Sequence, residues 1–228
     1  HVPTSMLDSF DALALEVADL PRAREFYARH LDADFELGDG EAAFDAGDTT
    51  VVLREPGPVP RGGVHVHYAF ETPPDEYGDW LDRVSELDVD EHDFGSARSL
   101  YVFDPDDHCV EIGSVGPDSG TGLTGVFEVV LEVEDLARAE SFYRDLDFSV
   151  MDRGTERRRV RLTGPVDLEL WEPQLGIADA RGGVHADLAF SGDVDAVRAA
   201  VSEDACSLES VDGGVRIRDP DGHYLTVS

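Results

Sequence analysis

DLPRAREFY, at residues 19–27, reappears as DLARAESFY at residues 135–143. Two more stretches recur in the same order and at a nearly constant offset: RGGVH at 61–65 and 181–185, and DPDDH at 104–108 with DPDGH at 219–223. Internal similarity of this kind decides the architecture of a chain. The sequence therefore contains a duplication, and the two copies should have the same fold.

Each copy contains a finer repeat of strand, helix and three strands. Alternating residues predict a first strand at 13–17, and Asp19 is placed to cap a helix whose apolar residues recur at helical spacing. The remaining predicted elements of the first copy are a strand at 50–54, a strand at 66–70, a helix at 75–87, and strands at 99–103 and 109–112. Units three and four begin near Phe127 and Ala186. Each of the four units is therefore predicted to be βαβββ.

The Gly, Pro and Ser residues of VGPDSGTGLTG, at 115–125, predict a linker between the copies. We expect a first domain at 6–114, which contains units one and two, and a second at 126–228, which contains units three and four. His1 to Ser5 precede the first methionine and are left out of this division.

The chain is strongly acidic, with 50 Asp and Glu against 18 basic residues, all of them Arg, and a net charge of −32. Such a surface is typical of a folded protein from a high-salt, halophilic cytoplasm, where salt screens self-repulsion. It disfavours nucleic acid and anionic membranes as partners, because both need basic patches. Two cysteines form no disulfide framework and favour a reducing compartment, so we expect a soluble cytoplasmic protein.

The motif Asp-Leu-x-Arg-Ala-x-x-Phe-Tyr, the HYAF stretch at 67–70 and the Asp-Pro-Asp-x-His turn followed by Glu111 together resemble the vicinal oxygen chelate superfamily. That group includes glyoxalase I, extradiol dioxygenases, fosfomycin-resistance enzymes and bleomycin-binding proteins. The resemblance implies an α+β fold of tandem glyoxalase/bleomycin-resistance/dioxygenase-type domains, in which pairs of units form eight-stranded cups. It does not fix the reaction, because this scaffold hosts many chemistries.

The resemblance also implies positions for metal ligands on the first and last strands of each unit. His67, Glu111 and Glu169 match them, and Glu128 stands where His or Gln is usual. The outer units hold unsuitable or unusual residues there: Ala12, Val52 or Leu53, Asp187 and Thr226. If units paired within each half, both cups would be incomplete. If unit two paired with unit three, one cup would receive all four donors, and we favour this exchanged pairing.

A site of one imidazole and three carboxylates suits Mn²⁺, Fe²⁺, Ni²⁺, Co²⁺ or Zn²⁺, and the sequence does not choose among them. The alternative is that Glu128 and Glu169 are ordinary acidic residues, which are common in this chain. Period-two alternation supports Glu128 as a metal ligand. Val129, Leu131 and Val133 should pack against the helix, which turns Glu128 into the cup.

Four of the eighteen arginines lie at 157–161, and alternation turns Arg157, Arg159 and Arg161 toward the cup. Guanidinium groups bind carboxylates in a bidentate way, so these arginines, with Trp171 on the same face, are candidates for binding an anionic substrate. Charge balance against neighbouring Asp and Glu explains the same cluster, and both explanations stay open.

The leading hypothesis is a metal-dependent lyase or isomerase like glyoxalase I, which acts through a metal-bound enediolate on a small molecule with adjacent oxygens. The resemblance makes Glu111 and Glu169 the candidate bases, while His67 and Glu128 would only hold the ion. An extradiol dioxygenase is the second hypothesis, although it needs two His and one Glu and only His67 matches. The third is a bleomycin-resistance type of binding protein that is not an enzyme. A fused chain of this kind can be a monomer or a homodimer.

Overall fold

The computed structural model describes residues 5–57, 66–156, 158–173 and 186–228. All four predicted units are found, each with one helix. Unit one consists of β1 (Leu7–Glu16), α1 (Leu20–Leu31), β2 (Glu36–Leu37), β3 (Glu41–Ala46) and β4 (Thr49–Arg54). Unit two consists of β5 (His67–Glu71), α2 (Tyr77–Arg83), β6 (Asp90–Asp93), β7 (Arg98–Phe103) and β8 (Cys109–Gly113).

The second half repeats this order. Unit three consists of β9 (Gly125–Glu132), α3 (Leu136–Asp145), β10 (Ser149–Arg153), β11 (Arg159–Thr163) and β12 (Asp167–Trp171). Unit four consists of β13 (Asp187–Gly192), α4 (Val194–Val201), β14 (Ser207–Val211), β15 (Gly214–Arg218) and β16 (Tyr224–Val227). The α+β class and the βαβββ repeat are therefore confirmed.

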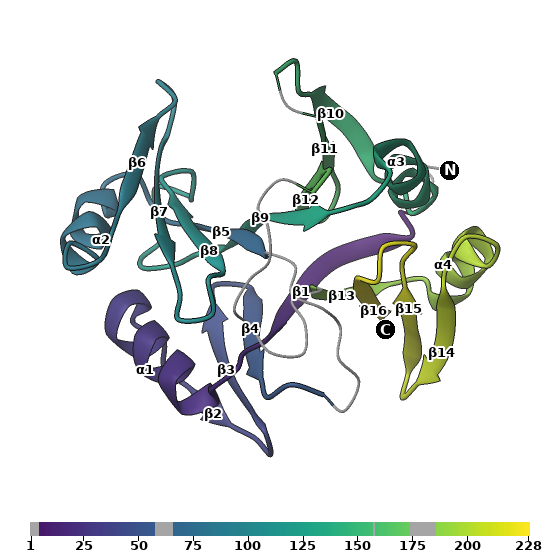
Figure 1. The fold of residues 1–228 in the computed structure, drawn as a ribbon, viewed down its shortest axis with the longest axis horizontal. Helices are drawn as coiled ribbons and strands as arrows, with labels where there is room; N and C mark the ends of the chain where they lie inside the picture. Colours follow the sequence, from purple (N-terminus) through teal and green to yellow (C-terminus); the bar gives the residue numbers. More distant parts are fainter. Residues whose placement is uncertain (1–4, 58–65, 157, 174–185) are drawn as a thin grey trace.

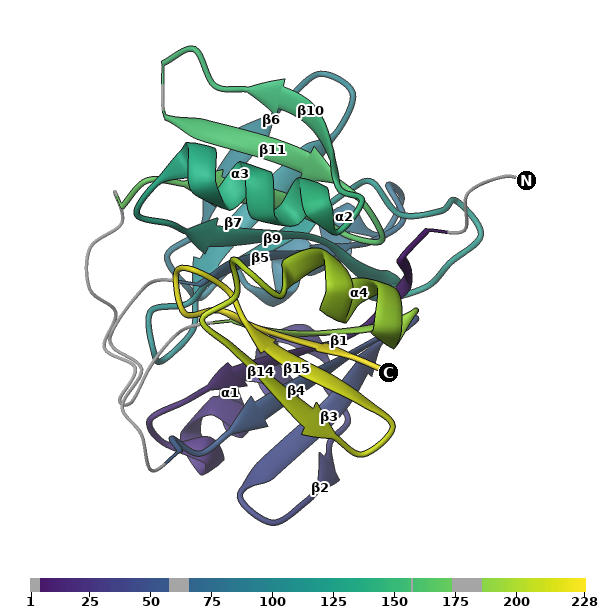
Figure 2. The same cartoon turned by 90° about the vertical axis from the view of Figure 1, so that its right-hand side faces the viewer.

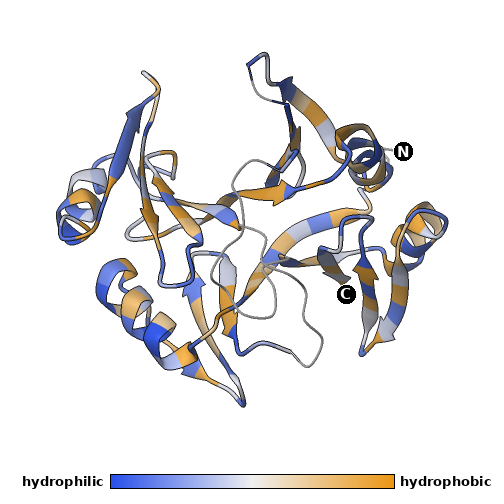
Figure 3. Ribbon diagram, viewed as in Figure 1, coloured by the Kyte–Doolittle hydropathy of each residue, from blue (hydrophilic) through white to orange (hydrophobic). Residues whose placement is uncertain are grey.

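The repeated Asp-Leu-x-Arg-Ala motif works as a helix start. The Asp19 side chain accepts a hydrogen bond from the Arg22 backbone N–H, and Asp135 does the same for Ala137 and Arg138. Each cap satisfies donors that the first turn of a helix leaves unpaired. Figure 3 shows that the helices and strands mix hydrophobic with hydrophilic residues, as expected of elements with one buried side.

The second helix is shorter than predicted, because α2 covers Tyr77–Arg83 instead of 75–87. Its start lacks a capping bond, since Glu76 makes no side-chain hydrogen bond to the first turn. At its end the chain tightens into turns in which the Ser85 N–H donates to the Asp82 carbonyl and the Leu87 N–H to the Val84 carbonyl. Hydropathy alone does not distinguish such turns from helix.

The units pair across the two halves of the chain. One eight-stranded sheet has the order β14-β15-β16-β13-β1-β4-β3-β2, and the other has the order β10-β11-β12-β9-β5-β8-β7-β6. Unit one therefore shares a sheet with unit four, and unit two with unit three (Figures 1 and 2). This is the exchanged pairing that the distribution of candidate ligands favoured. Each sheet joins one unit from each of the two predicted domains.

The two halves are also connected internally, through the repeated Asp-Pro-Asp-x-His turns. Asp104 accepts hydrogen bonds from the backbone N–H groups of Asp106 and His108, and from the hydroxyl of Tyr27 in α1. Asp106 in turn accepts from the Ala18 N–H. The turn of unit two thus binds the start of α1 in unit one.

The second half repeats this arrangement with Tyr143, Asp219 and Asp221. The buried His223 ring nitrogen Nε2 lies 2.8 Å from the carbonyl oxygen of Glu132, and His108 makes the matching contact to Glu16. These two histidines are therefore structural, as expected for turn residues. The repeated RGGVH stretches, at 61–65 and 181–185, lie outside the described residues.

The helices of one half of the chain contact each other, although their units belong to different sheets: α1 lies against α2, and α3 lies against α4 (Figure 1). Among the helices in the described ranges, none combines the length and the apolar character that a membrane crossing requires.

Candidate active site

The four predicted donors lie on four adjacent strands at the centre of one sheet. These strands are β12, β9, β5 and β8, and the donors are Glu169, Glu128, His67 and Glu111 in that order. Glu111 and Glu128 stand opposite the same residue, Ala69, from the two sides of β5. Residues in register across a sheet share a face, so both carboxylates flank Ala69 on one side of the sheet.

His67 and Glu111 are in direct contact. Nε2 of His67 lies 3.0 Å from Oε2 of Glu111, and both side chains are largely shielded from solvent. Burial raises the pKa of Glu111, but hydrogen bonds from His67, Ser99 and Tyr101 and the charge of His67 outweigh it, so the pKa falls below its usual value. Glu111 is therefore a fixed, ionised carboxylate.

Glu128 is also buried, but its pKa moves the other way. Burial raises the pKa of Glu128 to about 7; Arg161 opposes this rise, and the nearby charges of Glu169 and Glu111 add to it. Nη2 of Arg161 lies 2.9 Å from Oε2 of Glu128. The same nitrogen lies 3.1 Å from Oδ2 of Asp167, the residue opposite Glu128 on β12.

Glu169 is held by two partners, one on its own strand β12 and one on the neighbouring strand β11. The indole N–H of Trp171 donates a hydrogen bond of 2.6 Å to Oε2, and Nη1 of Arg159 lies 2.9 Å from Oε1. Arg159 also contacts Asp152 at 2.9 Å through Nη2. Arg159 and Arg161 thus face the cup as alternation predicted, while Val160 and Leu162 between and beyond them are buried in the core. Arg157 lies outside the described residues.

The donor types fit a divalent metal ion, since imidazole nitrogen and carboxylate oxygen are ordinary ligands of first-row metals. Their placement on one face fits as well, because Glu128 and Glu111 stand opposite Ala69, and His67 and Glu169 stand opposite Val130. In the arrangement described, however, only His67 and Glu111 touch, and no three His, Cys, Asp or Glu side chains of the described residues come together as a ready metal site. An ion ligated by Glu128 and Glu169 would compete with Arg161 and Arg159 for these carboxylates.

Sequence reasoning missed Tyr101 and Ser99, which stand on β7 beside Glu111. Leu100 and Val102 of this strand are fully buried, so alternation turns Ser99 and Tyr101 to the cup. Tyr101 is the register partner of Glu111, and burial raises its pKa, so that it keeps its proton and donates. The same period-two alternation that located Glu128 would have found both.

The other cup differs at every position that matches a donor. Ala12, Ala189 and Thr226 stand in register across β1, β13 and β16, where the first cup has Glu128, Ala69 and Glu111. On β4 the cup-side residue is Val52, since Leu53 is fully buried in the core. Asp187 is the one carboxylate among these positions, and Nη1 of Arg54 and Nη2 of Arg216 both lie 2.8 Å from its Oδ2.

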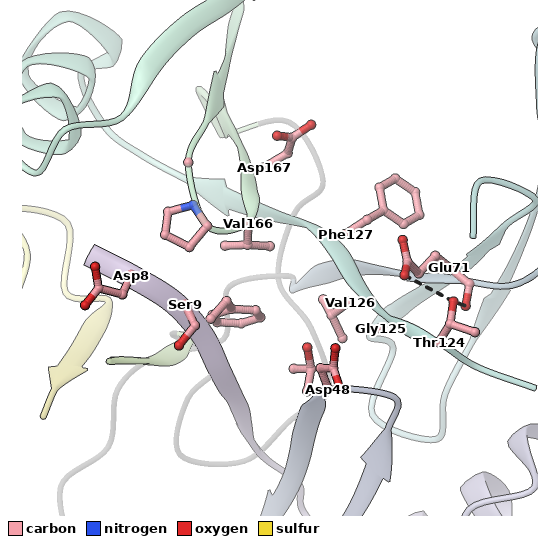
Figure 4. Close-up of a pocket in the computed structure, with 14 residues that line it drawn as sticks. Asp8, Ser9, Asp48, Glu71, Thr124, Gly125, Val126, Phe127, Val166 and Asp167 are labelled. Atoms are coloured by element: carbon pink, nitrogen blue, oxygen red, sulfur yellow. Dashed lines mark hydrogen bonds between the residues drawn. The ribbon is translucent and has the colours of Figure 1, made fainter. Parts of the chain in front are cut away.

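A cavity of about 490 Å³ lies between the two sheets, away from the predicted donors. Its walls come from β1, β4, β5, β9 and β12 and from residues next to these strands (Figure 4). The acidic residues that line it are Asp8, Asp48, Glu71 and Asp167. Glu71 is hydrogen-bonded to Thr124, and Asp167 is paired with Arg161. None of the four predicted donors lines this cavity.

No protein-family model matches the chain. Solved structures match it over nearly its full length. A candidate dioxygenase from Bacillus subtilis subsp. subtilis str. 168 is 14% identical with a TM-score of 0.73, and the match covers 98% of this chain and 86% of the other. Glyoxalase I from Zea mays is 16% identical with a TM-score of 0.69, over 96% and 91% of the two chains.

At such low identity these similarities show the fold alone. The activity has to be inferred from the residues of the site. Both matches extend over both halves of this chain, whose sheets pair units across the halves. The protein therefore shares the fold of these two structures, in which four βαβββ units here build two eight-stranded sheets.

Proposed function

We propose that the cup of units two and three is the active site of a metal-dependent lyase or isomerase that acts on a small molecule with two adjacent oxygens. One observation carries this proposal: four donors occupy adjacent strands on one face of this cup, while the other cup has Ala12, Val52, Asp187 and Thr226 in their places. In a chain with acidic residues throughout, chance would have spread the carboxylates over both cups.

In this proposal His67, Glu111, Glu128 and Glu169 hold the ion. A divalent ion held there supplies a Lewis acid that makes a carbon-bound proton beside the substrate oxygens more acidic. The protein must then remove that proton from one carbon and return it to the next.

Glu169 is the better placed of the two candidate bases. Glu111 is fixed by three side-chain donors that lower its pKa, which suits a ligand. Glu169 is held by Trp171 and Arg159 at the edge of the site, and its side chain is 12% exposed, against 6% for Glu111. A carboxylate with exchangeable partners can approach a substrate carbon without breaking the core of the site.

The dioxygenase alternative is weaker, because its iron site requires two His and one Glu on one face of the metal. His67 is the one histidine that the described strands bring to this cup face at a matching position. Oxygen uptake with a catechol and Fe²⁺ would favour that activity over a proton transfer.

The test begins with metal content. Protein purified without chelators should contain about one equivalent of a divalent first-row metal by elemental analysis. His67→Ala and Glu111→Gln should lose both this metal and the activity, which is measured as incorporation of deuterium from D₂O beside the carbonyl of a thiol–methylglyoxal adduct. Thr226→Val, at the position that matches Glu111 in the other cup, should change neither.

Wild-type metal content in both His67→Ala and Glu111→Gln would overturn the assignment of the site. A protein that binds metal in this cup but exchanges no substrate proton would keep the metal site and reject the proposed chemistry.

A further inference from the structure

We infer that Arg159 and Arg161 form an anion subsite that opens when Glu128 and Glu169 turn to a metal ion, and that this subsite binds a carboxylate group of the substrate. The inference rests on the proposed function, since it assumes that these two glutamates are metal ligands. It makes metal binding and anion binding mutually dependent.

Both guanidinium groups come from one strand and point to one face. Arg161 is the register partner of Glu169, and Arg159 is the register partner of Trp171. Each side chain is partly exposed, at 30% for Arg161 and 25% for Arg159. Both are therefore within reach of the donors and accessible to a ligand that enters the cup.

Each guanidinium is shared between two carboxylates of different kinds. Arg161 contacts Glu128, a predicted ligand, and Asp167, which is not one. Arg159 likewise contacts Glu169 and Asp152. If the glutamate leaves, the aspartate still holds the guanidinium in the cup, and the released N–H donors are free for another anion. A guanidinium has five donors in a planar fork, so one carboxylate does not saturate it.

Charge balance alone does not account for the positions of these arginines. In the other cup the same two strand positions are Glu41 and Ala43, by their register with Arg54 and Val52. There the arginines are Arg54 and Arg216, and both converge on Asp187 instead. Among the described residues, the strand of the other cup that matches β11 in the duplication therefore has no arginine at these positions, and Arg216, on β15, pairs with Asp187 instead of with a donor.

The exchange has a measurable consequence for metal affinity. A buried carboxylate that turns from a guanidinium to a metal ion gives up its ion pair, here the 2.9 Å contact between Glu128 and Arg161. Without Arg161, Glu128 has no ion pair to give up, so Arg161→Met should bind Mn²⁺ about tenfold more tightly than the wild type. Arg216→Met is the matched control, because it frees a carboxylate by the same substitution in the cup that lacks the donors.

The experiment is calorimetric titration of chelator-treated protein with Mn²⁺, and then with propionate in the presence and absence of saturating Mn²⁺. We expect propionate to bind the wild type at least fivefold more tightly when Mn²⁺ is bound, because coupling between two sites is reciprocal. Arg159→Met/Arg161→Met should lose propionate binding while it keeps Mn²⁺. Arg161→Gln replaces Arg161→Met if the latter unfolds, as judged by thermal melting.

The outcomes separate this inference from the proposed function. Absence of Mn²⁺ binding in all variants would overturn both. Equal Mn²⁺ affinity in Arg161→Met, Arg216→Met and the wild type would overturn the exchange and leave the proposed function standing. Propionate binding that survives the loss of both arginines would place the anion on the metal ion itself and overturn the subsite.

Discussion

The hydroxyl of Tyr143 donates a 2.7 Å hydrogen bond to Oδ2 of Asp219, and both residues are fully buried. Burial raises the pKa of Tyr143 far above its usual value, so it remains a donor. The other oxygen of Asp219 accepts from the N–H groups of Asp221 and His223. This bond therefore connects α3 of unit three to the repeated Asp-Pro-Asp-x-His turn of unit four. The strands of unit four belong to the other sheet.

Tyr143→Phe should lower the free energy of unfolding by about 1–3 kcal/mol, because it leaves a buried carboxylate oxygen without its donor. Chemical denaturation measures this change. Tyr77→Phe is the control, since Tyr77 donates to the exposed Glu91, where water can replace the lost bond. Equal losses in the two variants would show that burial of the acceptor does not matter here.

The buried Glu128 should make stability depend on pH in a direction opposite to that of most carboxylates. Its pKa in the folded protein, about 7, lies above the usual 4.5, so folding favours the protonated form. The contribution of this group is fully present below about pH 4.5 and is lost as the pH rises through 7.

Glu128→Gln should therefore remove part of the loss of stability between pH 5 and pH 8. The free energy of unfolding of chelator-treated wild type, minus that of the variant, should fall by about 1 kcal/mol or more across this range. A difference that stays constant with pH would contradict the raised pKa. Glu111→Gln provides the contrast. The pKa of Glu111 is lowered, so Glu111 stays ionised across this pH range and its replacement should give no such fall.

Glu169→Gln tests the role of the proposed base, with the metal content measured beside the rate because Glu169 is also a proposed ligand. The amide keeps an oxygen that can accept from the Trp171 indole, but it cannot take up a proton from carbon. The kcat should fall by about 10²–10⁴ while KM changes little, which steady-state kinetics would resolve. A variant with nearly full kcat would return the base role to Glu111.

Much of this organisation is predictable from sequence, because repeats and alternation are local properties. The duplicated motifs locate all four units, and the uneven distribution of His67, Glu111, Glu128 and Glu169 favours the exchanged pairing that the sheets have. Alternation also places Arg159 and Arg161 on the cup face. These inferences need only the periods of strand and helix.

The ion pairs within the cup could not be predicted in the same way. Arg161 on β11 reaches across β12 to Glu128 on β9, and that contact depends on strand order and register. Strand order and register both depend on how the units pair. The sequence allows two pairings, within each half or across the halves, and only favours the second. For the same reason, the competition between arginines and metal for Glu128 and Glu169 emerges only in three dimensions.

The acidic surface predicts strong dependence of stability on salt. A net charge of −32 on 228 residues repels itself, and the screening length shortens from about 30 Å at 0.01 M salt to about 8 Å at 0.15 M. The melting temperature should therefore rise steeply as KCl is added from low concentration, because added ions weaken repulsion more in the compact state than in the expanded one. Differential scanning calorimetry over a KCl series measures this rise. Tetramethylammonium chloride at equal ionic strength is the control: a matching rise supports screening, whereas a rise with KCl alone would point to specific K⁺ binding instead.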